Sequence, residues 1–383
     1  MLCSPRDDWP LLVEPGDEQP VRVVVVPKTM KAPRVIAVEP VCMQYTQQGL
    51  DDYLRTAVDH CSITAGHVNF RDQSVNQRFA LSSSKDGSYA TLDMKEASDR
   101  VSLAHVRALF QKFPRLLELL EATRSTRAQL PSGKIISLRK FASMGSALCF
   151  PVESLVFFTS ILASRILRAG DFPTARTVRK FSRDVYVYGD DLIVPADEAA
   201  AICDDLELLG FKVNRRKSFW TGQFRESCGV DAYAGEPVTP VYLRRLPPAN
   251  RVDASGIVSV VATANQLDQA GYRRAATMLK KHVESIIGKL PMVGPNSPSL
   301  GWLEYSDFQP RRRWNRALQR FEYLGWVPVS LERDDPLDGD PALAKCFRMI
   351  GLPMECRISP EHLDVSTRPY SLALKRRWVP ADT

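Results

Sequence analysis

The sequence lacks the cysteine and histidine patterns that build disulfide scaffolds, zinc ribbons or histidine-based active sites. Its eight cysteines are scattered without a Cys-x-x-Cys pair, and only five histidines occur in 383 residues. Regularly paired cysteines are typical of disulfide frameworks and of structural zinc sites. We therefore expect free thiols in a reducing compartment and a chemistry that rests neither on histidine nor on zinc.

Long apolar runs and internal repeats are also missing. The most apolar stretch, residues 147–167, is interrupted by Glu153 and Arg165, whereas a membrane-spanning helix needs about 20 predominantly apolar residues. No signal peptide, heptad repeat or low-complexity tract is recognisable. We therefore expect a soluble globular protein with no membrane partner.

Neither sign of charge is scarce, but bases outnumber acids. Lys and Arg total 51 against 44 Asp and Glu, which gives a formal net charge of +7. A basic excess favours a nucleic acid partner, because contacts to phosphates release counterions. The basic runs at residues 244–245, 311–313 and 375–377 are candidate contacts, although each one alone is more often a solvated face.

An acidic pair at a tight turn is the most informative feature. Asp190 and Asp191 follow Gly189 between two apolar arms, residues 184–187 and 192–194, whose alternation predicts a β-hairpin. Adjacent carboxylates repel each other unless a cation binds their oxygens, and Mg²⁺ accepts such a pair while leaving positions for phosphate. A solvated Asp-Asp turn is the alternative for this motif taken alone.

A further acid strengthens the metal interpretation. Residues 89–93 predict a strand that carries Asp93 near its end, and Asp99 follows shortly after. With Asp190 and Asp191, Asp93 could hold two Mg²⁺ ions, the arrangement that clamps the attacking and leaving oxygens in nucleotidyl transfer.

Two further segments have the composition of ligand-binding elements. Residues 142–147 predict a glycine-containing loop that leads into a helix over residues 153–162, for which a plain buried helix with its cap is the alternative. Lys28, Lys31 and Arg34 form a cationic cluster in a segment whose prolines argue against a regular helix. Their side chains could converge on a triphosphate, and a solvated basic loop is the alternative.

In this order the segments resemble the motifs of viral RNA-dependent RNA polymerases, above all the replicases of single-stranded RNA bacteriophages, the leviviruses. The resemblance extends over about residues 21–245 and is carried by residues 26–40, 93–99, 143–145 with 153–154, 188–191, 214–219 and 224–229. Each segment is short, and residues 224–229 are the most family-specific. Their common order and spacing make a chance match implausible.

The resemblance implies an α+β protein with a right-hand polymerase fold of fingers, palm and thumb, in which helices back an antiparallel palm sheet. It implies residues 1–85 as partial fingers with the basic motif, 86–245 as a palm with a fingers insertion, and 246–383 as thumb and C-terminal region. Apolar spacing predicts helices over residues 252–289, split near Gly271. The tail beyond residue 302 shows no legible pattern.

The activity implied is template-directed RNA synthesis, in which a 3′-OH attacks the α-phosphate of an NTP and pyrophosphate leaves. The resemblance makes Asp93, Asp190 and Asp191 catalytic residues and ligands of two Mg²⁺ ions, for which Mn²⁺ is an alternative. Asp191 is the less direct ligand. Lys217 is implied as the general acid for pyrophosphate.

The resemblance also implies the residues that bind the NTP. They are Lys28, Lys31, Arg34, Ser98, Asp99, Ser143 and Gly145. The carboxylate of Asp99 would accept a hydrogen bond from the 2′-OH that distinguishes RNA from DNA. A helix-start acid, favoured by the helix dipole, is the alternative for Asp99.

The partners implied are an RNA template, NTPs and host translation factors, in the cytoplasm of a bacterial host. A reverse transcriptase shares the palm, but Asp99 and residues 224–229 argue against it. A catalytically incomplete, RNA-binding replicase fragment is the other alternative. Two features depart from the family: Ser146 stands where the family commonly has Asn, and little sequence precedes the basic motif. We therefore expect part of the fingers to be absent.

Overall fold

The computed structural model describes residues 17–26, 34–304, 312–331 and 372–380. Lys28 and Lys31 lie outside them. The chain divides into two compact units, Met1–Thr239 and Pro240–Thr383, which are considered separately. This division lies near the expected end of the palm at residue 245, and the names fingers, palm and thumb stay predictions.

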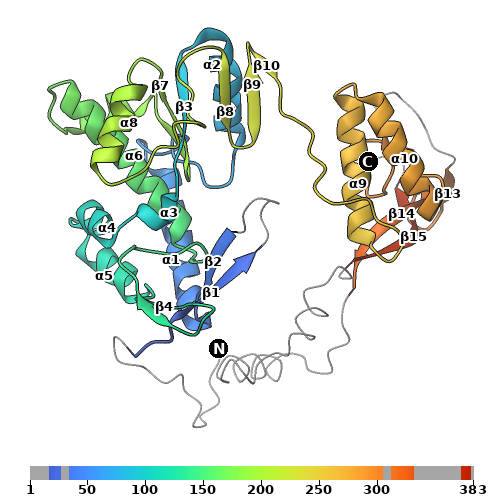
Figure 1. The fold of residues 1–383 in the computed structure, drawn as a ribbon, viewed down its shortest axis with the longest axis horizontal. Coiled ribbons are helices and arrows are strands. Elements are labelled where there is room, and N and C mark those ends of the chain that lie inside the picture. The colour runs from blue at the N-terminus through green and yellow to red at the C-terminus, as the bar shows by residue number, and fades with distance from the viewer. Residues whose placement is uncertain (1–16, 27–33, 305–311, 332–371, 381–383) are drawn as a thin grey trace. The chain divides into compact units, whose positions relative to one another are not determined.

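The first unit contains a three-stranded antiparallel sheet in the order β3-β7-β6 (Figure 1). Its strands are β3 (Tyr89–Asp93), β6 (Tyr186–Tyr188) and β7 (Asp191–Pro195). The register pairs Asp93 with Asp191, and Tyr188 with Asp191. The predicted strand and hairpin are confirmed, and the hairpin turn brings Asp190 next to the carboxyl end of β3.

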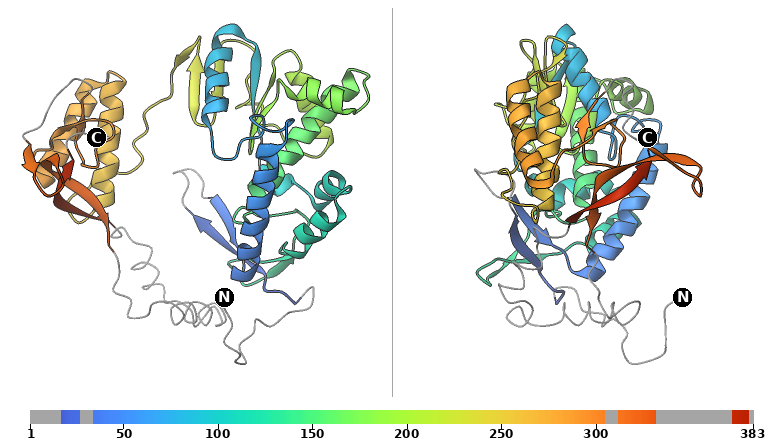
Figure 2. Two further views of the ribbon diagram at one scale, coloured as in Figure 1. Left: turned by 180° about the vertical axis from the view of Figure 1, so that it is seen from behind. Right: turned by 90° about the vertical axis from the view of Figure 1, so that its right-hand side faces the viewer.

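Helix α6 (Cys149–Arg168) is the core helix of this unit, and α1 (Val41–His60) packs beside it (Figure 2). By length and composition α6 is apolar enough to cross a membrane, which corrects the expectation that Glu153 and Arg165 make it too polar. However, 67% of its apolar window is buried inside the protein. Arg165 pairs with Glu198, with Nε 2.7 Å from Oε2. The apolar surface of α6 therefore packs within the protein core.

The other elements of the first unit surround this sheet and helix. They are β1 (Val21–Val26), β2 (Arg34–Val38), α2 (Ser74–Asp86), α3 (Ala97–Arg100), α4 (Leu103–Phe110), α5 (Pro114–Ala122), β4 (Arg127–Gln129), β5 (Ile135–Ser137), α7 (Ala175–Ser182), α8 (Ala199–Leu208), β8 (Phe224–Ser227), β9 (Val230–Tyr233) and β10 (Glu236–Pro237). Strands β2-β1-β4-β5 form one sheet and β10-β9-β8 another. In these two sheets β1 and β4 pair in parallel, and the other paired strands are antiparallel. With its mainly antiparallel strands and covering helices, the unit has the α+β class predicted.

The second unit combines a helix pair with short sheets. Helices α9 (Ala254–Gln269) and α10 (Arg273–Ile287) meet at Gly271, which confirms the predicted split. Gly271 has a φ of 83°, a conformation that glycine adopts without strain. The strands are β11 (Met292–Val293), β12 (Trp302–Leu303), β13 (Arg313–Asn315), β14 (Arg320–Ser330) and β15 (Leu372–Pro380). The sheet β13-β14-β15 was not predicted from the sequence.

Candidate active site

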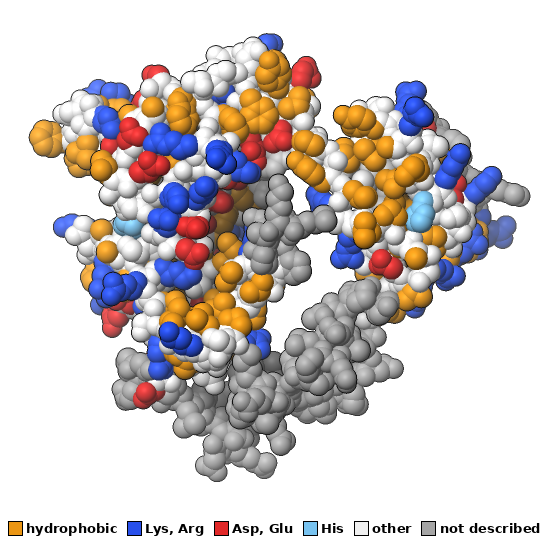
Figure 3. Space-filling model, viewed as in Figure 1, with side chains coloured by type: hydrophobic (Ala, Val, Ile, Leu, Met, Phe, Trp, Pro, Cys, Tyr) orange, Lys and Arg blue, Asp and Glu red, His pale blue; other side chains and the backbone are white. Residues whose placement is uncertain are grey.

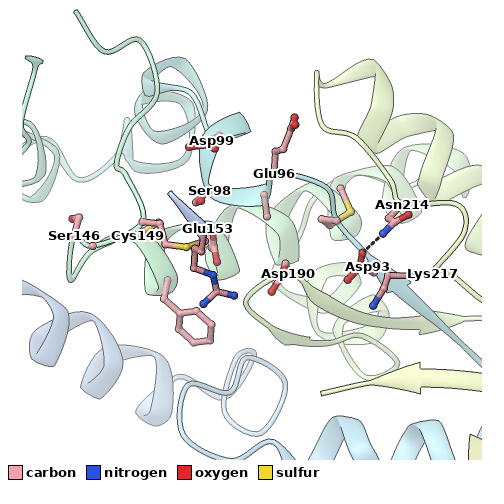
Figure 4. A pocket seen from close by; sticks show the side chains of 16 residues that line it. Asp93, Glu96, Ser98, Asp99, Ser146, Cys149, Glu153, Asp190, Asn214 and Lys217 are labelled. Atoms are coloured by element: carbon pink, nitrogen blue, oxygen red, sulfur yellow. Dashed lines mark hydrogen bonds between the residues drawn. The ribbon is translucent and has the colours of Figure 1, made fainter. Parts of the chain in front are cut away.

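A pocket with a cavity volume of about 590 Å³ lies at the carboxyl end of β3 (Figure 4). This volume is within the range of small-molecule sites. The predicted site residues that line it are Arg34, Asp93, Ser98, Asp99, Gly145, Asp190 and Lys217. Ser143 and Asp191 do not line it. Residues distant in the sequence, from β2 to residue 217, are thus gathered around one cavity.

Asp93 is held at the pocket by a segment that runs along β3. The Asn214 side chain donates to Asp93 Oδ2 at 2.6 Å, and the Asn214 backbone N–H donates to the Asp93 carbonyl at 2.8 Å. Burial raises the pKa of Asp93, the Asn214 hydrogen bond opposes that shift, and the negative charge of Asp190 adds to it. A carboxylate in this environment is stabilised by an added cation.

Asp191 has a different environment from Asp190, although the two are adjacent. Ser227 on β8 donates its hydroxyl to Asp191 Oδ1 at 3.4 Å, and Asn76 donates to the Asp191 carbonyl at 3.0 Å. Burial raises the pKa of Asp191 to about 6, and the charge of Asp190 adds to the shift. Asp190 therefore faces the pocket while Asp191 is anchored behind it, and a metal-binding role for Asp191 stays a prediction.

The hairpin turn requires glycine at position 189. Gly189 has a φ of 61°, and a Cβ there would lie 2.4 Å from the ring of Phe150 on α6. The Gly189 N–H donates to Ser154 Oγ, also on α6, at 3.2 Å. The core helix thus fixes the turn that presents Asp190.

Cationic groups stand on both sides of the acids. Lys217 Nζ lies 2.8 Å from Glu226 Oε1. The hydrogen bond to Glu226 is the largest cause of a raised pKa for Lys217, to which Asp93 also contributes. On the opposite side of the pocket, Lys140 Nζ lies 2.5 Å from Asp99 Oδ1. Figure 4 shows Lys217 beside Asp93, and Asp99 with Ser98 at the far side.

The loop over residues 143–146 packs tightly against the strand that carries Arg34. Gly145 has a φ of 131°, and a Cβ there would lie 2.0 Å from the carbonyl oxygen of Ala37. Ser143 is buried and does not line the pocket, and its role in binding the NTP stays a prediction. Ser146, which replaces the family's Asn, donates its hydroxyl to Gln47 Oε1 on α1 at 2.9 Å. This serine therefore makes an internal contact that links the loop to α1.

Glu153 is a pocket residue that the sequence reasoning left out of the site. It is only 7% exposed, and its Oε2 has no hydrogen-bond partner among the described residues. Burial raises the pKa of Glu153 to about 8, with the charges of Asp190 and Asp99 adding to the shift. Figure 4 shows Asp190 lying between Glu153 and Asp93. In the sequence, the sign that could have pointed to Glu153 is that it is a single acid among the apolar residues of α6.

The donor set at the pocket suits a cation that takes few protein ligands. Across the described ranges, no group of three or more His, Cys, Asp and Glu side chains is placed to hold a metal ion. Asp93 and Asp190 nonetheless both line the pocket. Mg²⁺ usually binds through one or two carboxylates and completes its shell with water and substrate phosphates. The two carboxylates therefore fit Mg²⁺ better than a metal that needs a full protein cage.

The chain belongs to the RNA replicase, beta-chain family, whose model matches residues 17–256. It is 31% identical over 373 residues to the RNA-directed RNA polymerase subunit beta of Escherichia virus Qbeta, covering 92% of this chain and 60% of that one. The corresponding subunit of Enterobacteria phage SP is 34% identical, covering 69% of this chain and 42% of that one. These matches confirm the resemblance to phage replicases.

The chain spans about three-fifths or less of the length of these relatives. The subunit from Qbeta virus (strain MX1) is 35% identical, and the match covers 58% of this chain and 35% of that one. Among solved structures, the RNA-dependent RNA polymerase of a human picorbirnavirus matches 70% of this chain and 57% of that one, at a TM-score of 0.44 and 11% identity.

Proposed function

We propose that this chain catalyses template-directed RNA synthesis as an RNA-directed RNA polymerase, the activity named for its relatives. The observation that carries the proposal is the convergence of Asp93 and Asp190 on one pocket that Arg34 and Lys217 also line. The carboxylates of Asp93 and Asp190 suit a metal ion, and the two cations suit the triphosphate that accompanies it. Family membership supports the same activity.

In this proposal Asp93 and Asp190 hold Mg²⁺, with Asp191 supporting them from behind. We propose two ions, with Mn²⁺ as an alternative. When bound, the metal supplies positive charge that stabilises the developing charge on phosphoryl oxygens. Both acids lie at the junction of β3 with the β6-β7 hairpin, so the sheet sets their separation.

The chain's own cations act on the phosphates. Arg34, with Lys28 and Lys31 expected beside it, binds the triphosphate through hydrogen bonds and charge. Lys217 is protonated at neutral pH like an ordinary lysine, and Glu226 and Asp93 raise its pKa further. It gives a proton to the leaving pyrophosphate. Glu226 fixes the position of the ammonium group.

The opposite side of the pocket contacts the ribose. Ser98 and Asp99 line this side, and the carboxylate of Asp99 is proposed to accept a hydrogen bond from the 2′-OH of an incoming NTP. In the structure Asp99 is paired with Lys140, and its side chain remains 57% exposed. One carboxylate oxygen can thus hold the lysine while the other meets the sugar.

The test is single-nucleotide extension of a primed RNA template by the purified chain with Mg²⁺. We expect incorporation of the complementary NTP, weak incorporation of the matching dNTP, and no incorporation after the metal is chelated. Preference for dNTP would favour a reverse transcriptase. RNA binding without incorporation under any metal or nucleotide condition would favour an RNA-binding replicase fragment.

The partners proposed are an RNA template, NTPs and, by analogy with phage replicases, host translation factors in the bacterial cytoplasm. We expect extension by the chain alone to be weak and to rise when bacterial extract is added, because bound partners can improve the positioning of the triphosphate that phosphoryl transfer needs. Full activity without extract would show that host factors are not required.

A further inference from the structure

One face of the sheet β13-β14-β15 in the second unit carries a row of arginine and tryptophan side chains. The register pairs Arg313 with Glu322, Leu324 with Trp378, and Trp326 with Arg376. Paired residues and every second residue along a strand share a face. Arg313, Trp378, Arg376 and Trp326 therefore lie on the same face of the sheet.

The charged and aromatic groups of this row are stacked on one another. The guanidinium of Arg313 lies 3.5 Å from the ring centre of Trp378, and that of Arg376 lies 5.6 Å from the ring centre of Trp326. Arg251, from outside the sheet, lies 4.9 Å from the ring centre of Trp326. A cation over an aromatic face at these distances is attracted to the ring. We call Arg251, Trp326, Arg376, Trp378 and Arg313 the Arg-Trp row.

The two ends of the row differ in exposure. Trp326 is 8% exposed and packs with Leu374 into the core formed with α9 and α10. Trp378 is 43% exposed, and Leu324 beside it is 40% exposed. Trp326 therefore packs in the core at one end of the row. At the other end, the indole of Trp378 and the side chain of Leu324 are exposed to solvent.

The row has an excess of positive charge. Glu322 is the acid on this face of the strands and is 2% exposed, beneath contacts from Arg313 at 3.4 Å and Arg320 at 3.0 Å. Arg251 and Arg376 are exposed. Lys and Arg side chains also gather at the edge of the second unit near β13 (Figure 3). Since one carboxylate cannot neutralise four arginines, the face attracts a polyanion.

We propose that the Arg-Trp row binds single-stranded RNA, with a base stacked on Trp378 and Arg313 and the backbone phosphates held by Arg376 and Arg251. Flat aromatic and guanidinium surfaces accept any base, and cations along the row follow the phosphates. Base-paired RNA keeps its bases inside the helix and cannot stack in this way. The site lies in the second unit and does not depend on the pocket of the first.

The experiment measures binding of a fluorescent oligouridylate to the full chain without NTPs. The test variant is Trp378→Ala, and the matched control is Trp314→Ala, which removes a tryptophan that is 46% exposed on the same sheet. Trp314 pairs with Phe321 and so lies on the opposite face. We expect Trp378→Ala to weaken binding about tenfold, the loss of one base stack, and Trp314→Ala to change it less than twofold.

Two further measurements distinguish base stacking on Trp378 from other effects of the substitution. Trp378→Phe retains an aromatic face and should restore most of the affinity, and duplex RNA should be insensitive to all three variants. Photocrosslinking of 4-thiouridine RNA to the unaltered chain should label residues 372–380. Equal binding by the Ala variants, or crosslinks confined to residues 1–239, would overturn the proposal. Because no NTP is added, neither result depends on polymerase activity.

Discussion

Each unit buries a glutamate, and the two glutamates differ in their hydrogen-bond partners and in the direction of their pKa shifts. Glu153 on α6 is 7% exposed and leaves Oε2 without a partner among the described residues. Glu322 on β14 is 2% exposed, but Arg313, Arg320 and Asn315 contact its carboxylate. Burial raises the pKa of Glu153, whereas the hydrogen bonds and positive charges around Glu322 lower its pKa. The first unit thus buries a carboxyl group without a partner in the described part of its pocket, whereas the second surrounds its buried carboxylate with positive charge.

This difference suits two kinds of ligand. Unmatched carboxylates around a pocket favour the arrival of a metal ion with its phosphates. A sheet face whose acid is already satisfied leaves its remaining arginines free to act on a polyanion. We therefore expect the chemistry to depend on the acids of the first unit and only RNA affinity to depend on the second.

The largest effect is expected at the acids of the pocket. Asp190→Asn and Asp93→Asn should each abolish nucleotide incorporation while leaving folding and RNA affinity nearly unchanged, because they remove charge that the metal requires. The measurement is single-turnover extension together with oligonucleotide binding. Asp197→Asn, at an exposed acid just beyond β7, is the control. Activity of either test variant within twofold of the unaltered chain would refute the metal assignment.

A smaller loss is expected at Lys217. Lys217→Gln should lower kcat by about a hundredfold, the lower range for loss of a general acid, with a modest change in KM. The neighbouring Arg216→Gln is the control, because Arg216 is exposed and does not line the pocket. If Arg216→Gln gives the larger loss of kcat, the proton donor has been assigned to the wrong residue.

A loss of sugar selectivity is expected at Asp99. Asp99→Ala should reduce the preference for NTP over dNTP about tenfold, since one hydrogen bond to a charged acceptor disappears. Competition between the two nucleotides measures the ratio directly. Glu96→Ala is the control, because Glu96 also lines the pocket and, like Asp99, pairs with a base, here Arg100. If Asp99→Ala keeps the preference for NTP over dNTP unchanged, Asp99 does not contact the sugar and acts only as an acid at the start of a helix.

The sequence predicted the parts of the site that local motifs encode. The strand ending at Asp93, the hairpin of Asp190 and the helix over residues 153–162 follow from alternation and apolar spacing within short windows. The break at Gly271 is equally local. These features need no knowledge of distant residues, so one sequence suffices to place them.

The parts that were missed depend on contacts between distant segments. Residues 313–330 and 372–380 form one sheet only because β14 pairs with β15 across a long intervening segment, and the Arg-Trp row exists only in that register. Likewise, the separate environments of Asp190 and Asp191 depend on Ser227, and the unpaired state of Glu153 depends on the packing of α6. Local spacing contains none of this information.

The smallest effect concerns stability, and it tests the contrast between the two buried glutamates. The folded pKa of Glu153 is raised from 4.5 to about 8, so the folded chain keeps a proton that the unfolded chain releases. Stability from this group therefore falls as pH rises from about 4.5 to 8. The folded pKa of Glu322 is lowered, so its contribution is present above pH 4.5 and is lost as pH falls through the folded pKa.

Glutamine substitutions separate these two contributions, because glutamine keeps the shape of a neutral glutamic acid and cannot ionise. Thermal melts in a metal chelator should show Glu153→Gln more stable than the unaltered chain at pH 8, by a few degrees, with little difference near pH 4.5. Glu322→Gln should be less stable at pH 8, because Arg313 and Arg320 lose their carboxylate, and the deficit should shrink in acid. If both variants shift the melting temperature in the same direction at pH 8, the environments of the two carboxylates do not differ in the way that the contrast requires.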